Sequence, residues 1–306
     1  MLEEIDRGLL EKIAELHETP VGAYNIRKDG QGVERRSTEN IEIATKADKP
    51  GIDVFVKPGT KNESVHIPVI LTRENIDDPV YNDFDIGSGA DVLIVAGCGI
   101  HSPGCGSSRH DGIHSFHVRS GARMRYVERH YGEGAAEAER ILNPETLVEA
   151  ESGSLVELEM VQIGGIDSTR RKTTVRLHDG ARLVLTERLL TSLVQKASSL
   201  ITIELVGEGS SAQVISRSVA RDSSEQEYFF ELVGRSECRG HIQCDAIIMD
   251  GARVSSTPKI SALDSRALLV HEAAIGRLEA EQLVKLESLG LSGKEAEEAI
   301  LDGFLG

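Results

Sequence analysis

Short strand-like runs make up most of the chain. Between about residues 40 and 270, apolar runs such as GIDVFVKPG, ADVLIVAG, LVELEMVQIG and LITIELVG are separated by glycine-containing turns. The turns resemble one another: SGA at 88 and 120, SGS at 152, DGA at 179, EGS at 208 and DGA at 250, at intervals of 32, 32, 27, 29 and 42 residues. No helical stretches lie between the runs, so crossover helices between strands are disfavoured. The pattern favours a mainly β fold, a β-solenoid whose coils stack on one another, with a β-sandwich as the alternative.

Helical periodicity is confined to the two ends. Residues 2–16 predict a short amphipathic helix whose apolar stripe packs on the body; the stripe comprises Ile5, Leu9, Ile13 and Leu16. Residues 277–290 place Leu278, Leu283 and Leu286 on roughly one face, and Gly290 is a natural helix stop.

A second C-terminal helix is predicted from residue 292 onward. Ser292 and Glu295 have the spacing of a capping box. Its apolar face comprises Ala296, Ala299, Ile300 and Phe304. We therefore divide the chain into an N-terminal helical segment and linker (1–39), a β-helix core (40–276) and a C-terminal helical segment (277–306). The two last helices either cap the β-helix or dock a partner.

Composition narrows the class of protein. The formal net charge is −16 and the isoelectric point about 5.1, which disfavours binding to a nucleic-acid backbone. There is no Trp and aromatics are 4%, so the core must rest on Val, Ile, Leu and Ala. The longest apolar run, residues 92–100, is too short to span a bilayer, and we find no signal peptide. We expect a cytoplasmic protein that binds no membrane and whose four cysteines are not structural disulfides.

One polar stretch, residues 98–117, concentrates metal-ligand side chains. They are Cys98, His101, Cys105, His110, His114 and His117. These types suit zinc or iron, but their spacing matches no known zinc ribbon or finger. The Gly, Ser and Pro between them are typical of a loop, and a loop whose histidines only form hydrogen bonds is the alternative. In an extended chain His114 and His117 would lie on opposite faces.

A second candidate lies in residues 237–254. Read as a strand, it places Ile242, Cys244 and Ala246 on one face and His241 on the other. Cys244 would then point toward the core, either as a small apolar side chain or as a protected thiol that binds metal or accepts sulfur.

The third candidate is the pair His271 and Glu272, which ends a strand-like run. A zinc-protease helix needs a second histidine at position 275, where this chain has Ile275. In a strand the two side chains point to opposite faces, so one of them faces inward and needs a partner. A pair at the exposed edge of the sheet is the alternative.

The last third of the chain resembles the SufB/SufD family of scaffold proteins for iron–sulfur cluster assembly. The matching elements are CD (244–245), P-x-I (258–260), HEA (271–273), IG (275–276), EQL (281–283), LGLSGKEA (289–296) and GF (303–304). A weaker match continues upstream through RMRYVERH and ARLVLTERLL. The resemblance implies a right-handed parallel β-helix with helical ends, in agreement with the turn pattern.

The resemblance also implies partners and site residues. Family members pair through the β-helix and bind a SufC-type ABC ATPase through the C-terminal helices, here with Leu283, Leu286, Ala296, Ile300 and Phe304 as the partner-binding residues. Cys244 and Glu272 match the SufB residues, and His271 matches the SufD histidine. Because one chain carries all three, a two-fold homodimer could present both halves of the site. The chain resembles short archaeal members in this respect.

Two features depart from longer SufB proteins. There is no N-terminal Cys-rich motif, and His130 occupies the position of the cysteine proposed to accept sulfur. A secondary metal or sulfur-accepting site could be formed instead by Cys98, His101, Cys105, His110, His114 and His130. A cysteine desulfurase or another donor would supply the sulfur. We expect the iron–sulfur cluster to be transient, with none tightly bound in aerobic preparations.

The scaffold interpretation makes the chain a binding protein and not an enzyme. It has no G-x-x-x-x-G-K-[ST] loop, so ATPase activity would belong to the partner. The alternatives are a zinc-dependent enzyme centred on residues 98–117 and a β-solenoid carbohydrate-active enzyme. The second alternative is disfavoured by the absence of Trp and the five Tyr, because sugars stack on aromatic side chains.

Overall fold

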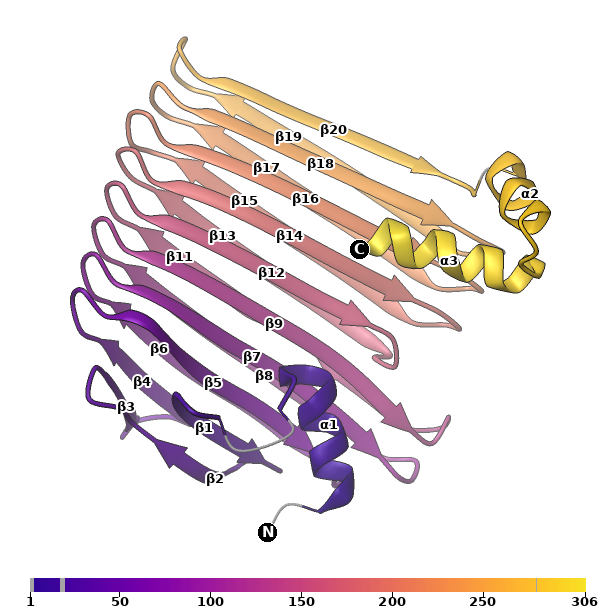
Figure 1. The fold of residues 1–306 in the computed structure, drawn as a ribbon, viewed down its shortest axis with the longest axis horizontal. Coiled ribbons are helices and arrows are strands. Elements are labelled where there is room, and N and C mark those ends of the chain that lie inside the picture. Colours follow the sequence, from indigo (N-terminus) through magenta and orange to yellow (C-terminus); the bar gives the residue numbers. More distant parts are fainter. Residues whose placement is uncertain (1–2, 17–19, 279) are drawn as a thin grey trace.

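The chain forms a parallel β-solenoid of about eight coils. A computed structural model describes residues 3–16, 20–278 and 280–306. Each coil contributes one strand to each of two facing sheets, which we call sheet A and sheet B (Figure 1). Sheet A has the order β2 (Gln31–Arg36), β1 (Ala23–Lys28), β5 (Lys61–Leu71), β7 (Asp91–Ser102), β9 (Arg123–Gly134), β12 (Leu155–Ile163), β14 (Arg182–Thr191), β16 (Ser211–Ala220), β18 (Arg239–Ile248) and β20 (Leu268–Gly276).

Sheet B stacks in the same direction. Its order is β3 (Ile41–Thr45), β4 (Gly51–Val56), β6 (Asp77–Ile86), β8 (Ser107–Val118), β10 (Glu139–Leu142), β13 (Ser168–Leu177), β15 (Lys196–Leu205), β17 (Glu225–Gly234) and β19 (Arg253–Ala262), with β11 (Glu145–Ala150) also pairing with β8 and β13. The prediction of a mainly β solenoid is confirmed, and the sandwich alternative is wrong because strands that follow one another along a sheet are parallel and one coil apart.

The turn pattern was partly misread from the sequence. Glycines with positive φ recur at one edge of the solenoid, at Gly89, Gly121, Gly153, Gly180 and Gly209. The DGA turn at 250 lies between β18 and β19, at the opposite edge, where Leu193, Asp222 and Asp250 take the left-handed conformation. The interval of 42 residues between the turns at 208 and 250 therefore compared turns at two opposite edges of the solenoid. Along each edge, successive turns are separated by nearly the same number of residues as the register pairs Arg182–Ser211 and Arg239–Leu268, whose members lie one coil apart.

Alternation along the strands builds the core. In β14 the buried Leu183, Leu185 and Leu189 alternate with side chains that face outward. The same alternation in every coil fills the space between the sheets with mostly aliphatic side chains. Burial of this continuous apolar column is what stabilises coils that could not fold alone.

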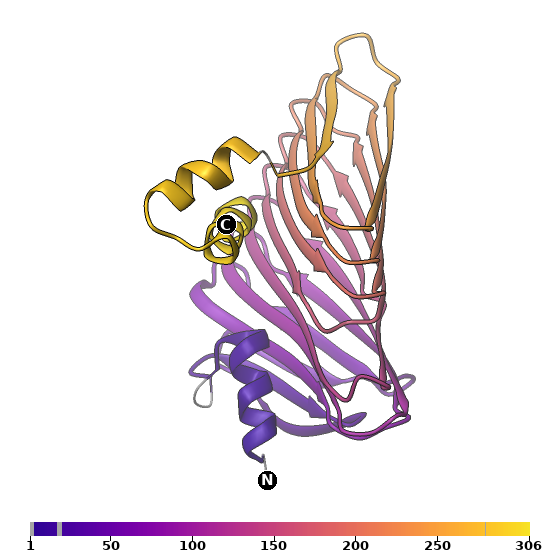
Figure 2. The same cartoon turned by 90° about the vertical axis from the view of Figure 1, so that its right-hand side faces the viewer.

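Helix α1 (Glu4–Ala14) covers the outer face of sheet A near the first coils (Figures 1 and 2). Its buried Leu9, Leu10 and Ile13 pack on β5 and β7. Gly97 makes this approach possible, because a Cβ at that position would lie 2.7 Å from the Ile13 carbonyl oxygen. The predicted helix is confirmed, although Ile5 is 44% exposed and Leu10 takes its place in the contact. The expected linker up to residue 39 contains the hairpin β1–β2.

The C-terminal segment forms two helices, α2 (Ala280–Ser288) and α3 (Gly293–Leu305). The capping box of Ser292 and Glu295 is present. Helix α3 packs on β16 through Leu301 and Leu305, with Val219 beneath them. In the described residues, no helix has the length and apolar character required to cross a bilayer.

Candidate functional site

The last coil leaves one end of the solenoid open. β19 and β20 are the final strands of the two sheets, and each has a neighbour on one side only. Apolar side chains of this coil are exposed, among them Leu268 on the outer face of β20 and Ile260, which is in register with the core residue Leu232 and points toward the open end. Ala267 and Leu269, which point inward, are only partly buried. The His271–Glu272 pair lies on the edge strand β20, the position given in the sequence analysis as the alternative for this pair.

Cys244 points into this coil from β18. Its side chain is 1% exposed and packs with the core, as the alternation of residues 242–246 predicted. Ser216 is its register neighbour on β16, and the Ser256 hydroxyl donates a hydrogen bond to Sγ at 3.9 Å. Burial raises the pKa of the Cys244 thiol to about 11, so the closed chain holds the thiol and not the thiolate.

His271 also points inward, from β20. Its ring stacks on Phe230 with centroids 6.2 Å apart. Among the described residues, neither Nδ1 nor Nε2 has a hydrogen-bond partner, although both atoms are buried. Burial, and the nearby charge of His241, lower the pKa of His271, so the ring is neutral. A buried imidazole with both nitrogens unpaired is costly and indicates a missing ligand or neighbour.

Glu272 lies on the other face of the same strand. Its carboxylate is exposed and 2.6 Å from His241 Nε2. In register, Glu272 is beside Gln243, while Cys244 is beside Ala273. The structure therefore brings Cys244 and His271 to one interior face and places Glu272 outside, where a neighbouring molecule could meet it.

Residues 98–117 are not a loop. They form the end of β7 and nearly all of β8, joined by a turn at residues 103–106. The loop prediction is wrong because these residues lie in strands, where Gly99 lets helix α1 approach the sheet closely: a Cβ at Gly99 would lie 3.2 Å from Leu9 of α1. His101 is beside Glu133, with Nδ1 and Oε1 3.4 Å apart, and Cys105 is exposed in the turn. Within the described part of the chain, no three His, Cys, Asp or Glu side chains are arranged to hold one metal ion.

Four of the predicted side chains do meet inside the solenoid. Cys98, His110, His114 and His130 line one small cavity of about 10 Å³, room for a single water molecule. Cys98 is in register with His130, one coil away. His117 faces outward toward Glu151, whereas His114 faces inward. The two side chains therefore lie on opposite faces of β8, as the sequence predicted.

The electrostatics of this cavity keep two of its imidazoles, His114 and His130, neutral. Burial lowers the pKa of His114 to about 4 and that of His130 to about 3. His110 is oriented by Asp78, with Nδ1 and Oδ2 3.0 Å apart. Burial, together with the charges of Asp78 and Glu128, raises the pKa of the Cys98 thiol well above its usual range. A neutral thiol beside the neutral rings of His114 and His130 is an unreactive arrangement in the closed chain.

A row of polar side chains connects this cavity with Cys244. We call it the interior polar row: Glu128, Arg171, Glu187, Ser216 and Cys244. The Arg171 guanidinium donates to Glu128 and lies 3.7 Å from Glu187. Ser216 donates to the other oxygen of Glu187 at 2.8 Å and is the register neighbour of Cys244. All five side chains are buried.

Glu128, Arg171 and Glu187 were not identified as candidate site residues in the sequence analysis. The alternation of buried and exposed positions could have identified them, because each occupies an inward position in its strand: Glu187, for example, lies between the buried Leu185 and Leu189. A charged residue at such a position needs a partner of opposite charge inside the solenoid.

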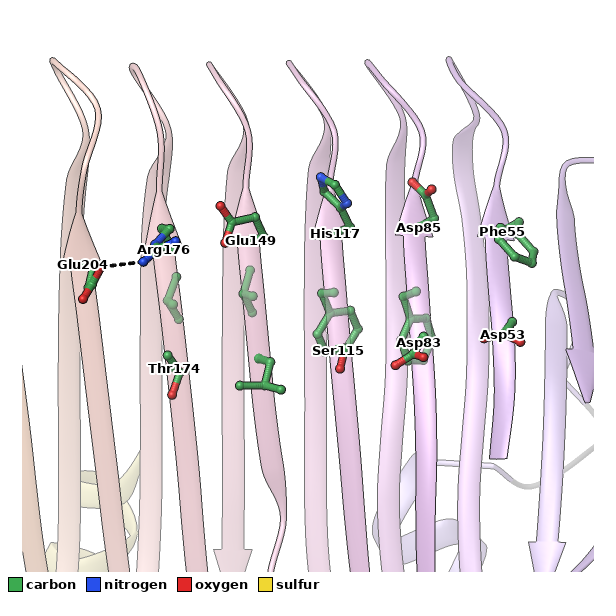
Figure 3. Close-up of a pocket in the computed structure, with 15 residues that line it drawn as sticks. Asp53, Phe55, Asp83, Asp85, Ser115, His117, Glu149, Thr174, Arg176 and Glu204 are labelled. Atoms are coloured by element: carbon green, nitrogen blue, oxygen red, sulfur yellow. Dashed lines mark hydrogen bonds and ion pairs between the residues drawn. The ribbon is translucent and has the colours of Figure 1, made fainter. Parts of the chain in front are cut away.

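The outer face of sheet B carries a separate hollow of about 530 Å³ (Figure 3). Successive strands contribute Asp85, His117, Glu149, Arg176 and Glu204, which follow one another in register. Its carboxylates are paired: for example, Arg176 donates to Glu204 at 3.1 Å, the dashed line in Figure 3. The hollow thus has little unpaired charge with which to attract a ligand.

Comparison with known proteins decides the family. A family model described as "SUF system FeS cluster assembly, SufBD core domain" matches residues 83–304. The chain belongs to the SufBD family. The match begins within β6 and extends into α3, so it includes the interior polar row and all of the last coil. SufBD proteins are in general non-catalytic scaffold components that act in iron–sulfur cluster assembly.

Relatives with the same description occur in archaea and bacteria. An iron-sulfur cluster assembly SufBD family protein of Archaeoglobus fulgidus is 26% identical over 274 residues, which cover 87% of this chain and 71% of the relative. One from Methanocaldococcus jannaschii is 25% identical, over 93% of this chain and 90% of its own length. The iron-sulfur cluster assembly protein SufB of Bacillus subtilis is 33% identical over 99 residues, 31% of this chain and 21% of that protein.

Proposed function

We propose that this SufBD protein is the scaffold of a SUF-type complex in which iron–sulfur clusters are built and passed on. The observation that carries the proposal is that Cys244 and His271 lie on the same interior face of the open last coil, where the imidazole has no hydrogen-bond partner among the described residues. Thiolate sulfur and neutral imidazole nitrogen are both ligands of iron–sulfur clusters. Here the cluster is the cargo of the protein and not a resident cofactor.

The open end supports a homodimer. Edge strands with unpaired backbone groups pair readily with another sheet edge, and β19 and β20 also expose apolar side chains. Pairing two last coils about a two-fold axis would cover the open end of the core and give His271 a neighbour. Glu272 lies on the outer face of its own chain. In such a dimer its carboxylate could contact the second copy across the interface.

The C-terminal helices are the proposed docking site of a SufC-type ABC ATPase. In α2 and just beyond it, Val284 and Leu289 are 62% and 73% exposed. The predicted partner-binding set divides in the structure. Ala296 is buried within the chain and is not accessible to a partner. Half-buried side chains stay proposed contacts of the ATPase: Leu283, Leu286, Ile300 and Phe304.

The chemistry explains why a scaffold of this kind needs a driven partner. With a pKa of about 11, fewer than about one Cys244 side chain in a thousand is a thiolate at pH 7. The thiolate is the form that binds iron or attacks sulfur. We propose that movement of the dimer seam, driven by the ATPase, hydrates Cys244 and so releases it for chemistry. A cytoplasmic location and a cysteine desulfurase as sulfur donor belong to the same proposal.

The interior polar row supports a route for sulfur within the solenoid. It begins at the cavity that Cys98 shares with His130 and ends at Cys244. Cys98 lies one coil from the position where longer family members carry the accepting cysteine, so we propose it as the accepting residue here. The half-buried His101 and the exposed Cys105 are outside this route.

The test is anaerobic reconstitution of the chain co-purified with a SufC-type ATPase. Cys244→Ser is expected to lose most of the bound iron and sulfide, because the substitution removes the soft ligand. Cys238→Ser changes a second buried cysteine, in the turn before β18. It is the matched control and is expected to retain iron and sulfide. Equal cluster content in the two variants would contradict the assignment of Cys244, and failure to bind any such ATPase would contradict the scaffold role.

A further inference from the structure

A groove of about 450 Å³ crosses the outer face of sheet A. We call it the sheet A groove. It crosses the first residues of β12, β14, β16, β18 and β20, and its side chains include Arg182, Val184, Ser211, Arg239, Leu268 and Val270. None of these side chains belongs to the interior site or to the C-terminal helices, so the proposed function leaves the groove unexplained.

The charge of the groove is unusual for this protein. Although the chain carries a net charge of −16, no carboxylate is found among the described residues that line the groove. Two strands apart, Arg182 and Arg239 lie on either side of the short Ser211. Across the described chain, neither guanidinium has a hydrogen bond or ion pair, whereas Arg176 on sheet B is paired with Glu204. The groove therefore offers two free positive charges.

Apolar side chains flank these charges. Val184, Leu268 and Val270 are 39%, 61% and 44% exposed. The outer face of sheet A already holds helices in two other places, where α1 packs on β7 and α3 packs on β16, each through leucines (Figure 2). The sheet A groove is a third apolar area of this face, and in the described structure no helix covers it.

The spacing of the arginines selects the kind of partner. Neighbouring strands are about 4.8 Å apart, so the backbones of Arg182 and Arg239 lie about 10 Å from each other along the groove. In an α-helix, side chains seven residues apart lie on one face and are separated by about 10.5 Å. A helix with two carboxylates at this spacing and leucines between them would match both the charges and the apolar flanks.

We propose that the sheet A groove is a docking site for an acidic amphipathic helix of a partner protein. A small anion is disfavoured because the groove is shallow and a small-molecule site must enclose most of its ligand. A nucleic acid is disfavoured because two arginines cannot offset the field of so acidic a protein. The groove ends at β20, so a docked helix would lie beside the strand that carries His271 and Glu272.

The test uses fluorescein-labelled helical peptides of about 20 residues, long enough to be helical in water. Each carries two Glu on one face of an Ala/Gln/Leu helix, four, seven or eleven residues apart. Fluorescence anisotropy against the full-length chain measures their affinities. We expect the seven-residue spacing to bind most tightly, and the binding to weaken as salt is raised.

Two double variants test the role of the arginines. Arg182→Ala/Arg239→Ala is expected to weaken binding of the seven-spaced peptide about 2- to 30-fold, the effect of losing two exposed ion pairs. Arg7→Ala/Arg170→Ala removes two exposed arginines that lie outside the groove and is expected to leave binding unchanged. Circular dichroism checks that both variants are folded.

Several results would overturn the proposal. Binding that depends neither on the spacing of the Glu residues nor on Arg182 and Arg239 would reject the helix. If inorganic phosphate or AMP bound through the two arginines while no peptide did, the site would belong to a small anion. If the groove variant changed the chain from a dimer to a monomer, the occupant would be a second copy. Neither the peptides nor the variants involve Cys244, so these outcomes are distinct from failure of the proposed function.

Discussion

Replacing Arg171 by methionine would test the interior polar row most directly. The Arg171 side chain is buried between Glu128 and Glu187, and it is the cation that balances Glu128 at neutral pH, because His130 is neutral above about pH 3. Methionine fills a similar volume without charge, so Arg171→Met leaves two buried carboxylates with no cation. Breaking a buried ion pair by removing one partner costs about 3–5 kcal/mol. We expect a loss of this size in the free energy of unfolding at pH 7.

The dependence on pH gives a sharper test than the loss alone. Burial tends to raise the pKa of Glu128, but the charges of His130 and Arg171 outweigh it and lower the pKa to about 2. In the wild type, Glu128 therefore contributes stability that is present above pH 4.5 and is lost as the pH falls toward 2. Without Arg171, burial dominates and the pKa rises above 4.5. The carboxyl group then contributes stability below pH 4.5 that is lost as the pH rises through the new pKa.

Urea denaturation followed by circular dichroism, at intervals between pH 5 and 8, measures both effects. The wild type should show little contribution from Glu128 across this range, whereas Arg171→Met should lose stability steadily as the pH rises. Protonation of His130 at low pH would strengthen the same trend. Arg176→Met is the control, because Arg176 lies on the same strand but faces solvent, and its loss should cost less than about 1 kcal/mol. Parallel pH profiles for wild type and Arg171→Met would refute the reasoning.

Three further predictions concern the helices and the thiols. Gly97→Val should displace α1, because a Cβ at Gly97 would lie 2.7 Å from the Ile13 carbonyl oxygen. The rate of amide hydrogen exchange in α1 should then rise. Unchanged protection of these amides would contradict the close contact. Iodoacetamide at pH 8 should label the exposed Cys105 long before Cys244, because Cys244 is buried and its pKa is about 11. Mass spectrometry of peptides measures the two rates. Equal rates would show that Cys244 is accessible to solvent in the free chain. Leu305→Asp should release α3 from β16 and leave the solenoid folded, and a loss of strand signal in circular dichroism would show that the helix is needed for the β body.

The sequence allowed the solenoid and its edge to be predicted because both depend on local pattern. Alternation placed Cys244 inward and separated His271 from Glu272, and it needed no knowledge of which strands are neighbours. Register is different, since it depends on the length of every turn. One misassigned turn, at residue 250, was enough to hide the true coil spacing.

The polar interior could not be predicted because it joins residues that are far apart in the chain. Arg171 meets Glu128 across the space between the two sheets, 43 residues away. In the sequence, neither residue differs from a charged surface residue until it is known which positions of its strand face inward. For residues 98–117 the error had another cause: Gly and Ser were taken for a loop, whereas Gly99 is needed where α1 approaches the sheet closely.

The two ends of the solenoid differ in a way that limits the size of any assembly. At the first coil, the chain turns back in the antiparallel pairs β1–β2 and β3–β4, and the outermost strand β2 carries Glu34, Arg35 and Arg36. Charged residues on an edge strand discourage pairing with another sheet. Among the described residues, the last coil has no such antiparallel cap. If two copies pair through it, as proposed above, the first coil of each copy faces outward with its charged strand, so such a stack would stop at two members and would not grow into a filament.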